Sequence, residues 1–233
     1  MEIHETEDHE YVDIHIERRR VIWITGLVLA GVIALVVLTA DKVSELAERV
    51  VRPVPYRPIP EVYDIKGYDA ASEFAFEKFL RKGSNREQFA ALENYLQSKQ
   101  VDDVVPLYEL LRQGSDWQKV GEPAFAIPPP KYWQSMVKTL RAVREEVIPA
   151  VGPVMVLSGW RTRVYNRKAG GARTSKHMHF CGLDMVPQRN FTRKKLIPIL
   201  RTIHQRDGKR WNMGLGIYSG IRFHVDTCGY RRW

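Results

Sequence analysis

Three side chains in the C-terminal part of the chain are of types that bind a divalent metal. His177 and Asp184 lie seven positions apart, and His224 lies in the later segment Phe223-His224-Val225-Asp226. Imidazole and carboxylate groups are ligands of zinc, and a catalytic zinc site keeps three protein ligands and one open position. By themselves, however, these residues are equally compatible with ordinary polar groups of the core or the surface.

The spacing of these residues determines which elements must position them. Seven residues exceed one helical turn, so the two side chains can converge if His177 ends a loop and Asp184 lies on the strand that follows it. A short β-rich run covers 154–157, and a second strand is expected over 182–186. A helix near 193–206 and a hairpin around Ser219-Gly220 complete this part.

The region before these strands has a helical pattern from about 67 to 150, in which the apolar positions form core-facing stripes. Helices followed by a small antiparallel sheet predict an α+β fold, with helices flanking the sheet. The polar loop 161–176 carries six basic residues. Most of these are expected to form a solvated surface.

Composition narrows the possible classes of protein. The 233 residues include 44% hydrophobic residues, enough to bury a core, so wholesale disorder is excluded. No phosphate-binding glycine motif occurs. The net charge of +9 is uneven, because residues 1–40 carry seven acidic and three basic residues, which leaves +13 on residues 41–233.

Residues 21–40, VIWITGLVLAGVIALVVLTA, contain no charged residue. A helix of this length spans about 30 Å, the thickness of a bilayer's hydrocarbon core. The run is longer than the apolar region of a cleaved signal peptide, so we expect an uncleaved single-pass transmembrane helix. Arg18, Arg19 and Arg20 favour a cytoplasmic N-terminus, although basic residues on the other side weaken this orientation.

The expected location is therefore the cytoplasmic (inner) membrane, with the C-terminal domain in the periplasm or otherwise outside the cytoplasm. Four prolines between 51 and 60 predict a stiff, extended spacer, with an irregular loop as the alternative. The expected organisation is an acidic tail (1–20), an anchor (21–40), a Pro-rich spacer (41–66), a helical lead-in (67–120) and a C-terminal domain (121–233) that carries the candidate ligands.

Several motifs occur in an order that resembles a known family. They are Ser158-Gly159-Trp160-Arg161, Asn166, Gly170-Gly171, Ser175-x-His177-x6-Asp184, His224-x-Asp226 and a terminal Arg-x-Trp. This order resembles the D-alanyl-D-alanine carboxypeptidase-like zinc peptidases, within the group that includes lysostaphin-type and hedgehog-type zinc domains. The resemblance covers roughly residues 120–233.

The resemblance implies zinc bound by His177, Asp184 and His224. It implies that Arg161 binds substrate or stabilises the oxyanion, and that Ser175 contacts the substrate. The implied substrate is a peptidoglycan stem peptide or cross-link cut near a D-amino acid, by a D,D-carboxypeptidase or an endopeptidase.

Two positions depart from the family pattern. Phe180 stands where a glycine is common, three residues after the first ligand. The usual positions of the general base hold Ile221 and Arg222, and neither side chain can accept a proton. Asp226, on the same strand face as His224, is the first remaining candidate for the base, and His179 is a second, for which a solvent-facing position is expected. The alternative role of Asp226 is to accept a hydrogen bond from a ligand imidazole or an arginine.

Cys181 and Cys228 flank the second and third proposed ligands, and we favour a disulfide between them over thiolate ligation of zinc. Two functions remain open: a membrane-anchored peptidase, and a non-catalytic zinc-containing module that binds the cell wall. Nucleic acid is not an expected partner, because a translocated domain would not meet it. The oligomeric state, the bond that is cut and the partner of the acidic tail are not predicted.

Overall fold

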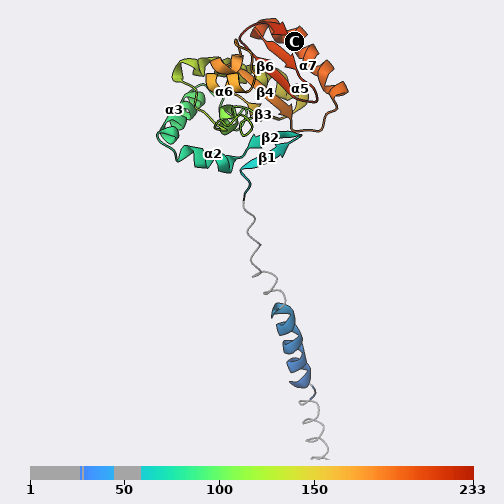
Figure 1. Cartoon of the computed structure of the whole chain (residues 1–233). Helices are drawn as coiled ribbons and strands as arrows, with labels where there is room; N and C mark the ends of the chain where they lie inside the picture. Colours follow the sequence, from blue (N-terminus) through green and yellow to red (C-terminus); the bar gives the residue numbers. More distant parts are fainter. Residues whose placement is uncertain (1–26, 28, 45–58) are drawn as a thin grey trace, which may run out of the picture. The chain divides into compact units, whose positions relative to one another are not determined.

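The computed structural model describes residues 27, 29–44 and 59–233. The chain divides into two units, residues 1–58 and 59–233 (Figure 1). The expected acidic tail and most of the expected Pro-rich spacer lie outside the described residues.

Residues 29–44 of the first unit are helical. Their large apolar side chains are exposed, with Leu29 at 60% and Leu35 at 63%. Within the described ranges, no helix is both long enough and apolar enough to cross a bilayer. Residues 21–26 and 28 of the expected anchor lie outside these ranges, so the anchor stays a prediction.

The second unit begins with a β-hairpin. The sequence analysis expected the end of the Pro-rich spacer and the start of the helical lead-in in this part of the chain. Strands β1 (Val62–Ile65) and β2 (Tyr68–Ala71) pair antiparallel. Lys66 and Gly67 connect them with φ values of 56° and 86°, the positive values that a two-residue hairpin turn of the I′ type requires. The helical pattern therefore begins later than expected, at Glu73.

Helices fill most of the chain before the sheet. The Ser72 hydroxyl accepts a hydrogen bond from Ala75 N and so caps the first of them. These elements are α2 (Glu73–Leu80), α3 (Asn85–Ser98), the 3₁₀ turns η1 (Leu107–Leu111) and η2 (Pro130–Tyr132), α4 (Trp133–Ala142), the π-helical η3 (Val143–Val147) and α5 (Ile148–Val151).

The second half of the unit contains a five-stranded sheet in the order β3-β4-β6-β5-β7. The first four strands in this order pair antiparallel, and the short edge strand β7 runs parallel to β5. The elements are β3 (Val154–Ser158), α6 (Arg163–Lys168), the 3₁₀ turn η4 (Lys176–His179), β4 (Gly182–Pro187), α7 (Arg193–Trp211), β5 (Gly214–Ile217), β6 (Phe223–Asp226) and β7 (Arg231–Arg232). The fold is α+β, as predicted.

One hydrophobic core joins the helices to the sheet. Phe76 and Leu92, from the helices before residue 120, lie in the same buried cluster as Met136, Leu183 and Phe223. Residues on both sides of the expected boundary at residue 120 thus share this core, and residues 59–233 form one compact unit.

A buried ion pair connects the early elements to the sheet. Arg112 is 2% exposed and its Nη1 lies 3.1 Å from Glu109 Oε1. Its guanidinium also donates to the carbonyl oxygens of Ala71 (2.9 Å) and Val156 (2.7 Å), and Glu109 accepts from Val156 N. One arginine thus fixes β2, η1 and β3 together.

We expect Arg112→Met to destabilise the protein by roughly 3–5 kcal/mol, because it leaves the Glu109 carboxylate buried without its cation. Arg86→Met is the control, since Arg86 forms an exposed ion pair with Glu77 and should cost about 0–1 kcal/mol. Urea unfolding followed by tryptophan fluorescence measures both changes. Equal effects of the two substitutions would contradict a structural role for the buried pair.

Candidate metal centre

The three proposed ligands come from three elements that meet at one end of the sheet. His177 lies on η4, Asp184 on β4 and His224 on β6. Strands β4 and β6 are hydrogen-bonded neighbours, and their register places Asp184 directly opposite His224. All three side chains are buried, with 2–3% of each residue exposed.

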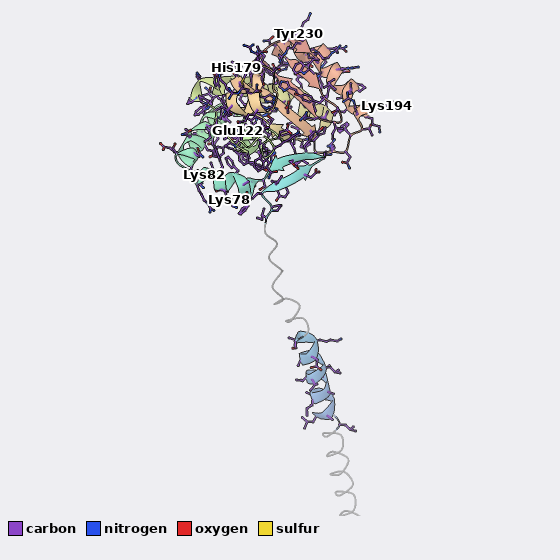
Figure 2. The ribbon with its side chains drawn as sticks, in the orientation of Figure 1. Lys78, Lys82, Glu122, His179, Lys194 and Tyr230 are labelled. Atoms are coloured by element: carbon purple, nitrogen blue, oxygen red, sulfur yellow. A yellow bond between two sulfur atoms is a disulfide. The ribbon has the colours of Figure 1, made fainter. Side chains whose placement is uncertain are left out.

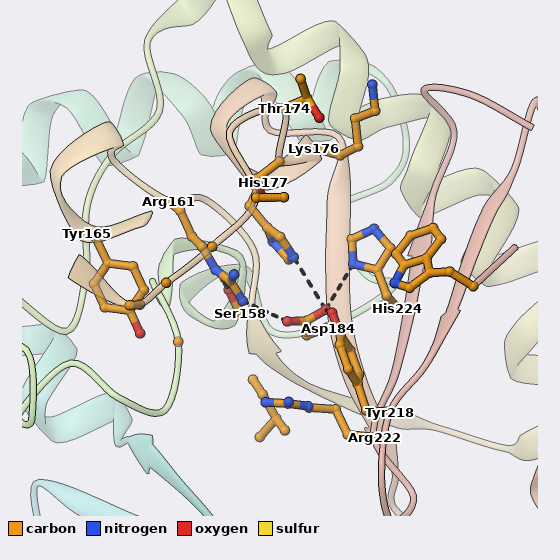
Figure 3. Close-up of a pocket in the computed structure, with 18 of the residues that line it drawn as sticks. Ser158, Arg161, Tyr165, Thr174, Lys176, His177, Asp184, Tyr218, Arg222 and His224 are labelled. Atoms are coloured by element: carbon orange, nitrogen blue, oxygen red, sulfur yellow. Dashed lines mark hydrogen bonds and ion pairs between the residues drawn. The ribbon is translucent and has the colours of Figure 1, made fainter. Parts of the chain in front are cut away.

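The ligand atoms converge with the spacing of a metal site (Figure 3). His177 Nε2 lies 3.3 Å from Asp184 Oδ1, and His224 Nδ1 lies 2.9 Å from the same oxygen. All three ligand atoms lie within 4.8 Å of one another. Zinc–ligand distances of about 2.0–2.1 Å in a tetrahedron give ligand–ligand distances of about 3.3–3.4 Å, close to those observed.

Hydrogen bonds on the outer side of each imidazole fix its tautomer. His177 Nδ1 donates to the carbonyl oxygen of Gly159 at 2.8 Å, which leaves the lone pair on Nε2. That Nε2 atom is buried and makes no hydrogen bond in the described structure. A buried imidazole nitrogen without a hydrogen bond needs another partner, and this one faces a carboxylate and a second imidazole. These three groups are of the types that bind zinc, so the residues fit a zinc ion.

Asp226 lies behind His224 rather than at the open side of the centre. Its Oδ2 accepts from His224 Nε2 at 3.0 Å, on the opposite side of the ring from the ligand atom Nδ1. Asp226 also binds Arg231 through both oxygens, and none of its surface is exposed. These contacts do not favour Asp226 as the general base. The carboxylate orients His224, the alternative role that the sequence left open.

Arg161 also contacts the centre through a ligand. Its Nη2 donates to Asp184 Oδ2 at 2.7 Å, while its Nε donates to Ser158 Oγ and to the carbonyl oxygen of Gln113. Burial by itself would raise the pKa of Asp184. The adjacent His177, His224 and Arg161 outweigh burial and hold this pKa well below its usual value, so the ligand is ionised.

The two imidazoles differ in their tendency to take up a proton. Burial and the charge of Arg161 lower the pKa of His177 to about 4, so its ring is neutral and ready to bind metal. Burial also acts to lower the pKa of His224, but hydrogen bonds to Asp184 and Asp226 outweigh it, and the pKa is raised. A metal ion therefore competes with a proton at His224 more than at His177.

The centre opens into a cavity of about 710 Å³. Ser175 and Arg161, the expected substrate contacts, both line it. The cavity also contains residues that the sequence analysis missed, among them Asp116, Tyr218 and Arg222. His179, in contrast, is exposed and packs edge-on against Tyr132 (Figure 2).

Tyr218 and Gln113 are the missed residues closest to the ligand set. The Tyr218 hydroxyl donates to Asp184 Oδ1 at 3.1 Å. Gln113 is 1% exposed, and its side-chain oxygen accepts from the backbone N and the hydroxyl of Thr162, next to Arg161. A lone tyrosine or glutamine carries no spacing signal, so neither role is visible without the fold.

The loop between His177 and Asp184 contains one residue with a left-handed backbone conformation. Phe180, at the position where the family commonly has glycine, adopts the left-handed region with φ of 49°. Glycine enters that region without steric cost, which accounts for the family preference. In this chain the ring is fully buried and packs edge-on against Trp160, so burial of an aromatic side chain offsets the strain.

A disulfide joins Cys181 to Cys228, the pairing that the sequence analysis favoured. Cys181 directly precedes β4 and Cys228 follows β6, and their Cα atoms lie 6.3 Å apart. The cross-link therefore fastens the two strands that carry Asp184 and His224. Gly182 beside it leaves room for the His224 ring, because a Cβ there would lie 2.5 Å from His224 Cε1.

One comparison with known proteins matches part of this region to a family model. Residues 106–220 match the family model described as Peptidase M15. The match covers just under half of the chain, includes His177 and Asp184, and ends before His224. No curated protein and no solved structure matches the chain. The match supports a zinc-dependent peptidase of the M15 family, the group of D-alanyl-D-alanine carboxypeptidase-like enzymes.

We expect His177→Ala to abolish stoichiometric zinc binding, because two ligands and an open cavity hold the ion far more weakly than three. Zinc content after dialysis, measured by atomic emission, tests this. His179→Ala is the matched control, since His179 is exposed and lies outside the ligand set. Retention of one zinc per chain in His177→Ala would contradict the assignment.

We expect Asp226→Asn to weaken zinc binding by about 10- to 100-fold, because the imidazole of His224 loses its charged orienting partner. Competition with a chromogenic chelator measures the affinity. Asp103→Asn removes an exposed carboxylate that pairs with Arg144 and should leave the affinity unchanged. An Asp226→Asn protein that binds zinc as tightly as the unmodified chain would rule out the orienting role.

Proposed function

We propose that this protein is a zinc metallopeptidase that hydrolyses peptidoglycan stem peptides or cross-links next to a D-amino acid. The observation that carries the proposal is the convergence of His177 Nε2, Asp184 Oδ1 and His224 Nδ1 in a buried centre that faces a cavity. When bound, zinc would supply Lewis acidity toward a scissile carbonyl and an activated water. The chain's own residues must bind the peptide and move the proton.

Arg161 has two roles in this proposal. Its Nη2 keeps Asp184 ionised and correctly turned, through the 2.7 Å contact with Oδ2. The side chain also lines the cavity and remains 16% exposed, which leaves part of the guanidinium accessible to a substrate oxygen. A fixed cation beside the reacting carbonyl stabilises the negative charge that develops on its oxygen.

A different carboxylate must accept the proton, since Asp226 lies behind His224. Asp116 and Asp184 are the two acidic residues that line the cavity, and Asp184 is a proposed ligand. Asp116 is exposed, and its carboxylate makes no ion pair or hydrogen bond with the described residues. We assign to Asp116 the role of proton acceptor during attack and donor to the leaving amine.

The charge of the surroundings supports an acidic peptide as substrate. Two of the six basic residues of segment 161–176, Arg161 and Lys176, line the cavity. Peptidoglycan stem peptides carry free carboxylates, and a basic rim attracts them before they bind. The uncharged segment 21–40 supports the further proposal that the enzyme is anchored in the cytoplasmic membrane with residues 59–233 outside the cytoplasm.

The proposal predicts that the zinc-loaded chain releases D-alanine from purified peptidoglycan fragments or opens their cross-links, and that a chelator stops the reaction. Mass spectrometry of the products identifies the bond. Bound zinc together with no cleavage of any fragment would reject the enzyme and favour a zinc-containing wall-binding module. That alternative is supported by the presence of Ile221 and Arg222 where related enzymes carry a base.

Asp116→Asn should lower kcat by at least about 100-fold and leave the zinc content unchanged, because the amide cannot take up a proton. Steady-state cleavage of the best fragment measures the effect. Asp69→Asn, on the exposed side of β2, provides the control. An Asp116→Asn enzyme with full activity would assign the proton transfer to another group.

A further inference from the structure

Arg222 is a cation in the metal cavity that has no carboxylate partner. Three arginines line this cavity. Arg161 pairs with Asp184, and Arg231 pairs with Asp226. Arg222 forms no ion pair with the described residues, and its Nε is buried without a hydrogen-bond partner.

Two tyrosines hold the Arg222 side chain in place. Its Cζ lies 4.2 Å from the ring centroid of Tyr218 and 5.1 Å from that of Tyr68. Tyr68 in turn donates a hydrogen bond to the carbonyl oxygen of Ser219, in the turn after β5. Aromatic rings stabilise the charge of a guanidinium but leave its N–H donors unused, so the group is positioned without being neutralised.

Arg222 also lies close to the metal centre. The Tyr218 ring that it stacks on carries the hydroxyl that donates to Asp184 Oδ1, so one tyrosine ring separates the guanidinium from a proposed metal ligand. Figure 3 shows Arg222 beside Tyr218 in the same cavity as Asp184. A group bound to Arg222 would therefore occupy the same cavity as a substrate held at the centre.

We propose that Arg222 is a specificity-determining residue that binds a carboxylate of the substrate adjoining the scissile bond. This proposal rests on the proposed function and adds that the substrate must carry a negative charge next to the scissile bond. A guanidinium presents paired donors that match a carboxylate in a bidentate arrangement.

The carboxylate could be the C-terminal one or the α-carboxylate of a γ-linked D-glutamyl residue, and two pairs of probes separate these sources. One pair is diacetyl-L-lysyl-D-alanyl-D-alanine and its C-terminal amide. The other is L-alanyl-γ-D-glutamyl-L-lysine amide with the glutamyl α-carboxylate free or amidated. Isothermal titration of the zinc-loaded full-length chain in detergent measures binding, and mass spectrometry follows cleavage.

We expect the protein to bind the free acid of one pair about 10- to 100-fold more tightly than its amide, and Arg222→Gln to lose this preference while binding the amide as before. Arg193→Gln is the matched control, because Arg193 donates to the carbonyl oxygens of Tyr218 and Gly220 and so supports the same hairpin without lining the cavity. This variant should keep the preference. If Arg222→Gln does not retain zinc, Arg222→Lys is tested in its place. We expect this variant to bind the acid more tightly than the amide by a smaller factor than the unmodified protein does.

Equal binding of acid and amide in both pairs, or an unchanged preference in Arg222→Gln, would overturn the proposal. Failure of the proposed peptidase activity is distinguishable from this result. A protein that cleaves neither pair but still binds the acid through Arg222 would be a carboxylate-binding wall module rather than an enzyme. A protein that cleaves acid and amide equally would be a peptidase without the Arg222 subsite.

Discussion

The pairing of β4 with β6 places Asp184 directly opposite His224, and the metal centre depends on this register. In an antiparallel pair, a shift of one residue moves every side chain to the other face of the sheet. Such a shift would separate the carboxylate from the imidazole and bring apolar neighbours such as Val225 into the centre. The disulfide between Cys181 and Cys228 lies at the end of the same strand pair and opposes that shift.

Each ligand is held from behind by a different part of the chain. His177 donates to Gly159, whose backbone N donates to the carbonyl oxygen of Arg112. Arg112 is in turn fixed by the buried pair with Glu109. A Cβ at Gly159 would lie 2.2 Å from the Leu110 carbonyl oxygen, so that contact requires glycine. The early helices are therefore part of the centre's support, which explains why residues 59–233 share one core.

Sequence reasoning reached the ligand types, the strands that carry them and the order of elements around them. These features have local signals: apolar alternation for strands, and His and Asp at the ends of such runs. It missed the β1–β2 hairpin, because two four-residue strands offer too little alternation to compete with a proline-rich neighbourhood. It could not decide between the two roles of Asp226 either. The ring of His224 has two nitrogens, and spacing alone does not say which one faces the centre.

The position of Asp226 and the presence of an arginine at position 222 both affect the charge of the cavity. This chain places a guanidinium two residues before His224 and keeps the Asp226 carboxylate sealed behind the ring. Arg161 and Arg222 both line the cavity and make it positive beside the centre. A positive cavity favours an anionic substrate and makes proton acceptance harder. This polarity is consistent with the proposed acceptor, because Asp116 is an exposed carboxylate that lines the cavity.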